Sequence, residues 1–137
     1  MSDTKPAVEN EKAKFVRDIM WAEIGYRRDK MWKLFSWVNT LLTGITGGVI
    51  ALKTHPDKPF NLGLGYKVAL TMAVAGLVVH AYFWLGYNWS KVREIWAGLK
   101  AYGDASGITF VEFGRSPVRY GYAVVLLGLA AVVAIWL

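Results

Sequence analysis

Three apolar runs, each close to twenty residues long, constrain this chain more than any other feature of its sequence. They cover residues 34–52, 68–85 and 120–137. A helix of about 20 apolar residues is long enough to cross a hydrocarbon core of roughly 30 Å. In a chain of 137 residues with a mean hydropathy of +0.30, three such runs leave too little polar sequence to cover a soluble core. The sequence therefore predicts an all-α membrane protein with three transmembrane helices.

Polarity and turn residues place the segment boundaries within one integral membrane domain. Pro56 and Pro59 interrupt any helix after the first run, and Gly103 is a plausible C-cap for the second helix. Ser116 and Pro117 are typical of a helix start, and the first run is too long for a cleaved signal peptide. We expect a disordered tail (1–10), a cytoplasmic amphipathic helix (11–30), a first span (31–52), an outer loop (53–66), a second span with a cytoplasmic extension (67–102), a cytoplasmic loop (103–117) and a third span (118–137).

Two narrow apolar seams lie outside the spans. Their members recur every three or four residues, the spacing of a coiled-coil contact. One seam precedes the first span and the other follows the second span, so we expect them to pack as an antiparallel cytoplasmic helical hairpin. Gly25 weakens the first helix and allows a kink there. The alternative for that helix is a position on the lipid surface. The seams are Phe15, Ile19, Ala22 and Tyr26, and Val92, Ile95, Leu99 and Tyr102.

The distribution of basic residues predicts the topology. Thirteen of the sixteen lysines and arginines lie before the first span or between the second and third spans, and three lie in the first loop. Cytoplasmic loops carry the excess of lysine and arginine. The N-terminus and the second loop are therefore expected in the cytoplasm and the C-terminus outside, in a bacterial inner membrane. Four basic residues near the membrane surface, Arg27, Arg28, Lys30 and Lys33, are expected to contact anionic headgroups.

The first span is the most polar of the three. At about 100° per residue its small and polar residues gather on one side. Small residues let helix backbones approach closely in lipid. This side is expected to meet another helix or, alternatively, to line a water-filled path. It comprises Ser36, Asn39, Thr40, Thr43, Gly44, Gly47 and Gly48.

His80 is the ionisable residue of the second span, and it shares its side of the helix with Ala73 and Gly76. Counted by helix rise, it lies about 12 Å from the cytoplasmic interface, at a depth similar to Asn39–Thr43. We expect this side to pack on the polar side of the first span, with His80 hydrogen-bonded there. The alternatives are a proton or ion path and haem ligation. The other histidine, His55, is too far along the membrane normal to share a haem within one chain.

Several classes of function have no support in the sequence. The chain has no cysteine, and it has no nucleotide-binding, nucleophile-elbow or zinc-ligand motif. The net charge is +6, but basic residues alternate with acidic ones and follow the membrane, so nucleic acid binding is not expected. No catalytic residue, metal or cofactor is predicted.

These observations favour a small non-enzymatic membrane protein. The leading hypothesis is a subunit or scaffold that associates with itself or with a larger membrane complex by helix packing. The alternative is a pore- or channel-forming effector in which the first span lines the path. A minor alternative is a haem-binding redox protein that uses His80.

Overall fold

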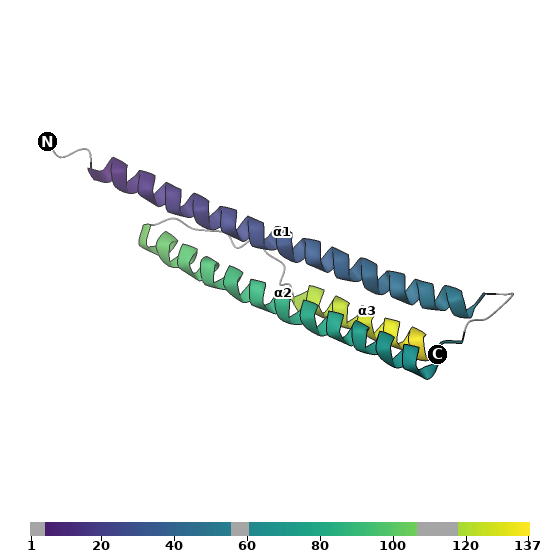
Figure 1. The fold of residues 1–137 in the computed structure, drawn as a ribbon. Coiled ribbons are helices and arrows are strands. Elements are labelled where there is room, and N and C mark those ends of the chain that lie inside the picture. Colours follow the sequence, from purple (N-terminus) through teal and green to yellow (C-terminus); the bar gives the residue numbers. More distant parts are fainter. Residues whose placement is uncertain (1–4, 56–60, 107–117) are drawn as a thin grey trace. The chain divides into compact units, whose positions relative to one another are not determined.

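The computed structural model describes residues 5–55, 61–106 and 118–137, and these residues form three α-helices (Figure 1). Helix α1 is Lys5–Lys53, α2 is Leu64–Ser106 and α3 is Val118–Trp136. Each helix is long and apolar enough to cross a membrane. The predicted all-helical class and the three candidate spans are therefore confirmed for the part of the chain that is described.

Helices α1 and α2 are longer than the sequence predicted. One helix covers both the predicted cytoplasmic helix and the first span, and it begins at Lys5, inside the predicted tail. Pro6 is compatible with this start because the N–H that proline lacks has no intrahelical partner in a first turn. Gly25 lies within α1, and Gly103 lies within α2 instead of ending it. Residues 56–60 and 107–117, including the predicted helix start at Ser116 and Pro117, are outside the described ranges.

The chain divides into two compact units. The polar unit consists of Met1–Lys30 and Asn88–Arg115, and the apolar unit consists of Met31–Tyr87 and Ser116–Leu137. The division falls between residues 30 and 31 of α1 and between residues 87 and 88 of α2. The first division lies a few residues before the apolar run 34–52 begins, and the second lies a few residues after the apolar run 68–85 ends. Each unit is described by itself below.

Within the apolar unit, α1 and α3 run in the same direction. The ring of Tyr120 lies 4.7 Å from that of Phe35 and 6.1 Å from that of Trp32, measured between centroids. At the other end of these helices, Lys53 Nζ donates hydrogen bonds of 2.9 Å to the carbonyl oxygens of Ala134 and Ile135. A lysine in this position satisfies carbonyl groups that the last turn of a helix leaves without partners.

Helix α2 runs opposite to α3 in the same unit, and Figure 1 shows α3 beside the first part of α2. Trp136 Nε1 donates a 3.0 Å hydrogen bond to Thr71 Oγ1. A Cβ atom at Gly128 would collide with the side chain of Val78. A Cβ atom at Gly121 would lie 3.3 Å from the ring of Tyr82. Glycine at positions 121 and 128 therefore permits the close approach of α3 to α2.

Residues buried in the apolar unit recur every three, four or seven positions along each helix. This spacing is that of helices packed at a shallow angle with knobs-into-holes contacts. The buried side of each helix is a single stripe, and the opposite side is exposed. The buried residues are Met31, Val38, Leu42 and Val49 of α1, Val74, Ala81 and Leu85 of α2, and Gly121, Val124, Gly128, Ala131 and Ile135 of α3.

In the polar unit, contacts join the first part of α1 to the last part of α2. The rings of Trp21 and Trp96 meet edge to face with their centroids 5.4 Å apart. A Cβ atom at Gly98 would lie 3.9 Å from Met20 Cε. Edge-to-face aromatic pairs contribute about 0.5–1.5 kcal/mol beyond their burial. The residues buried in this unit are Ile24 of α1, and Asn88, Val92, Leu99 and Gly103 of α2.

Candidate helix-packing site

The side of α1 that faces away from the buried stripe of the apolar unit is small and polar. A Cβ atom at Gly44, Gly47 or Gly48 would meet no described atom within 4 Å. The chain therefore leaves the predicted packing side of the first span uncovered among the described residues. We call the exposed residues of this side the outer face of α1: Ser36, Thr40, Thr43, Gly44, Gly47 and Gly48.

Two threonine hydroxyls of this region have acceptors within α1. Thr40 Oγ1 donates a 2.9 Å hydrogen bond to the carbonyl oxygen of Ser36, and Thr46 Oγ1 donates one of 2.8 Å to that of Leu42. A hydroxyl bonded to the carbonyl four residues earlier leaves no unpaired donor in an apolar environment. The Thr40 hydroxyl therefore keeps its hydrogen bond whether the outer face of α1 contacts lipid or a second helix.

Asn39 is in a different situation from the residues of the outer face. Its side chain is half-buried, and its Oδ1 atom is covered without a hydrogen-bond partner among the described residues. A buried amide oxygen without a partner costs about 1–3 kcal/mol. Of the seven residues predicted to form the polar side of the first span, Asn39 is the one that the structure turns partly inward.

The structure does not bring the His80 side of α2 to the outer face of α1. Ala73, Gly76 and His80 are exposed, and a Cβ atom at Gly76 would meet nothing within 4 Å. His80 makes no hydrogen bond or ion pair with a residue of the described ranges. The reason is that α2 buries the stripe of Val74 and Ala81. Ala81 follows His80 in the chain, and successive residues of a helix lie about 100° apart.

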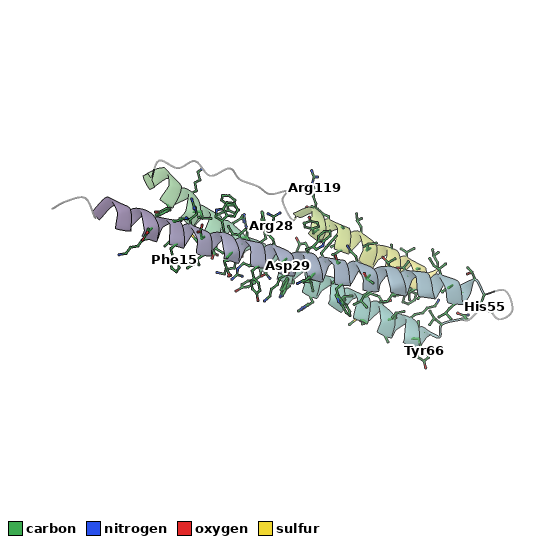
Figure 2. The ribbon with its side chains drawn as sticks, turned by 90° about the horizontal axis from the view of Figure 1, so that it is seen from above. Phe15, Arg28, Asp29, His55, Tyr66 and Arg119 are labelled. Atoms are coloured by element: carbon green, nitrogen blue, oxygen red, sulfur yellow. The ribbon has the colours of Figure 1, made fainter. Side chains whose placement is uncertain are left out.

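The two predicted cytoplasmic seams have different positions in the polar unit. On α2, Val92 and Leu99 are buried, with exposed fractions of 1% and 0%, and Ile95 and Tyr102 are half-buried. On α1, the predicted residues are exposed: Phe15 by 66%, Ile19 by 53%, Tyr26 by 55%, and Ala22 as well. Figure 2 shows Phe15 pointing away from α2. We call these four residues the Phe15 strip.

The difference on α1 has a physical reason. Met20, Trp21 and Ile24 take the inward positions, and the neighbouring positions of the same stripe are half-buried arginines, Arg17 and Arg27. Sequence reasoning instead expected Arg27 to contact anionic headgroups. The aliphatic stems of the two arginines can cover apolar surface while the charged group reaches water. Nε of Arg27 also lies 2.7 Å from Glu23 Oε1.

Three of the four predicted lipid-contacting residues are exposed. Arg28, Lys30 and Lys33 lie on the surface, whereas Arg27 is half-buried with its ion-pair partner. Lys30 Nζ lies 4.4 Å from the centroid of the Tyr26 ring, a cation–π distance. Figure 2 shows Arg28 and the neighbouring Asp29 on α1. Opposite charges therefore alternate on this part of the surface.

Sequence reasoning missed the contacts that join α3 to the other helices. It named no packing residue on the third span, whereas Gly121 and Gly128 lie close to side chains of α2. Their signal in the sequence is the spacing of three, four and three that links Gly121, Val124, Gly128 and Ala131. The bonds of Lys53 and of Trp136 to other helices had no signal in the sequence, because each depends on which helix ends lie together.

Comparison with known protein families, with curated proteins and with solved structures finds no match to this chain. The described residues contain no group of three or more His, Cys, Asp or Glu side chains placed to hold a metal ion.

Proposed function

We propose that this chain is a small integral membrane protein without enzymatic activity, a subunit or scaffold that associates with itself or with a larger membrane complex. The observation that carries the proposal is the uncovered outer face of α1 within the apolar unit. Small residues favour helix association in lipid because they allow extensive van der Waals contact between backbones. Glycine at positions 44, 47 and 48 gives no advantage on a helix side that contacts lipid. On a side that packs against another helix, it allows closer approach of the two backbones.

The same proposal includes an orientation. The three apolar helices suggest a membrane location. The excess of basic residues before the first span and between the second and third spans supports a cytoplasmic N-terminus and an outer C-terminus in a bacterial inner membrane. The polar unit would then lie in the cytoplasm as an antiparallel helical hairpin. The contact between Trp21 and Trp96 supports this hairpin.

Association can be measured by native mass spectrometry and affinity purification of the full chain in mild detergent. The expected result is a stable oligomer, or a larger complex that retains the chain. Gly47→Leu should reduce the assembled fraction, and Gly86→Leu is the matched control because Gly86 also has open space around its Cβ position but lies on α2. A monomer without partners, or equal effects of both variants, would contradict the proposal. So would a liposome conductance that Thr43→Leu abolishes.

Orientation can be measured separately because the chain has no cysteine. His55 follows α1, and Lys100 lies in the polar unit; both are exposed. In intact cells a membrane-impermeant maleimide should label His55→Cys and should label Lys100→Cys only after permeabilisation. The opposite pattern would reverse the topology and leave the association proposal standing.

A further inference from the structure

The Thr43 hydroxyl of α1 has no hydrogen bond with a described residue. The other described threonines of the apolar unit, at positions 40, 46, 54 and 71, each donate to the carbonyl oxygen four residues earlier, and Thr43 does not. On α2, the His80 imidazole is likewise without a partner among the described residues. A polar group left unsatisfied in hydrocarbon is costly. Both side chains are exposed, so a partner can reach each of them.

Thr43 and His80 lie at nearly the same depth in the apolar unit. Helix α3 provides a common scale, because it runs parallel to α1 and antiparallel to α2 and touches both. Counted from these contacts at about 1.5 Å per residue in each helix, His80 is level with Leu41, about 3 Å along the axis from Thr43. The contacts are those of Tyr120 with Phe35 and of Gly128 with Val78.

Small residues accompany both polar groups in the same direction. Toward the Lys53 end of the apolar unit, Gly47 lies one turn beyond Thr43, and Gly76 lies one turn beyond His80. A Cβ atom at either glycine would meet no described atom within 4 Å. Small residues let helix backbones approach closely enough for side chains to hydrogen-bond across the contact. The two exposed sides therefore match in depth, in small residues and in polar groups.

We infer that the His80 side of α2 in one copy of this chain packs against the outer face of α1 in a second copy, with a hydrogen bond between His80 and Thr43. The inference rests on the proposed function and names the partner and both contact surfaces. A threonine hydroxyl donates one hydrogen bond and can accept others, and a neutral imidazole has one donor and one acceptor nitrogen. Each group therefore supplies the partner that the other lacks.

A second copy is the partner that fits, because the chain carries both halves of the contact. Copies that insert in the same direction present α1 and α2 antiparallel, as in the apolar unit of one chain, so the depths of His80 and Thr43 stay matched. Lipid tails at this depth offer no hydrogen bond. Residues 36–48 and 69–80 contain no aspartate, glutamate, lysine or arginine, so the contact brings no like charges together. It joins two different surfaces and is therefore heterologous.

Disulfide formation between two differently tagged copies of the full chain tests the contact in membranes. The chain has no cysteine of its own, and each copy receives one, so any disulfide joins two copies. Gly44→Cys in one copy and Gly76→Cys in the other should give several-fold more mixed dimer than Gly44→Cys with Ala75→Cys. Ala75 is exposed at almost the same depth but lies about 100° around α2 from Gly76. Equal yields from the two combinations would overturn the inference.

Other crosslinking patterns separate this inference from the proposed function. If native mass spectrometry shows an oligomer but Gly44→Cys crosslinks with itself rather than with Gly76→Cys, two α1 helices pair, and the inference is overturned while the proposed function stands. The same holds if the chain is retained in a larger complex and no two copies crosslink. A monomer without partners would contradict both.

Energetic coupling tests the hydrogen bond without a cysteine. Thr43→Val and His80→Leu should each raise the dissociation constant of the copies in liposomes, measured by energy transfer between tagged copies, about threefold, the effect of one interhelical hydrogen bond in lipid. The double substitution should lose no more than either single one, because each removes the same bond. Thr46→Val is the control and should leave the constant unchanged, since the Thr46 hydroxyl bonds to Leu42 within α1. Additive losses, or no loss in the single variants, would overturn the inference.

Discussion

Two adjacent residues of α1 show how hydrogen bonding within a helix decides what a polar side chain costs. The Thr40 hydroxyl has an acceptor in the carbonyl oxygen of Ser36, and the Asn39 side-chain oxygen is covered without a partner among the described residues. Asn39→Leu keeps the branched shape and the number of heavy atoms and removes the unpaired oxygen, so we expect it to raise the free energy of unfolding by about 1 kcal/mol. Thermal unfolding in detergent, followed by tryptophan fluorescence, measures the change.

The control for this substitution is Thr40→Val, which keeps the shape of the side chain at the next position. It removes the Thr40 hydroxyl, so no donor is left without an acceptor. The carbonyl of Ser36 keeps its backbone hydrogen bond within α1. We therefore expect a change within about 0.5 kcal/mol. A fall in stability for Asn39→Leu would contradict the prediction, because it would mean that the amide has a partner in the folded protein.

At the scale of the helix, the contact between α2 and α3 depends on a glycine. In Gly128→Ala the new Cβ would collide with the side chain of Val78, and overpacking of this kind costs about 1–3 kcal/mol. Gly86→Ala is the matched substitution where no described atom lies within 4 Å, and there alanine should be neutral or slightly stabilising. We expect a lower unfolding temperature for Gly128→Ala alone. Equal temperatures for the two variants would refute the proximity of α3 to α2.

The helices themselves were predictable from the sequence, whereas their buried sides were predictable only in part. Run length and polarity are local properties, so the three spans and the α3 bounds at 118 and 136–137 could be found. A spacing of three and four, however, occurs in α1 on the Phe15 strip and also on the stripe of Trp21 and Ile24. The second stripe is buried because Trp21 packs against Trp96 and because arginine stems cover apolar surface. Both effects depend on how the helices pair, which the sequence does not give.

The sequence likewise could not show which glycines would lie at contacts between the helices of one chain. Gly44 and Gly48 lie on the small and polar side of the first span, which the sequence predicts to meet another helix. The structure uses Gly121 and Gly128, seven residues apart, for the contacts inside the chain. Composition can indicate that a helix side is suited to close packing, but the identity of the partner depends on which helices lie together. The described residues consequently leave the outer face of α1 uncovered.

At the scale of the whole molecule, α1 and α2 each contribute to both compact units, yet the contacts that hold each unit are separate. Trp21 and Trp96 belong to the polar unit, and the Lys53 and Trp136 bonds belong to the apolar unit. Regions of one protein can open with different free energies. Trp96→Ala removes an aromatic pair worth about 0.5–1.5 kcal/mol beyond its burial, and we expect this loss to appear in the polar unit alone.

Hydrogen–deuterium exchange of the full chain in lipid nanodiscs measures this directly. For Trp96→Ala, deuterium uptake should increase severalfold in peptides from 15–30 and 90–103 and should stay unchanged in peptides from 68–85. Arg93→Ala is the control, since Arg93 is exposed on the same part of α2. The 68–85 segment should stay protected because the apolar unit keeps its Gly128 contact and its Lys53 and Trp136 bonds in the variant. Uptake that increases equally in 68–85 would show that the two units open as one cooperative body.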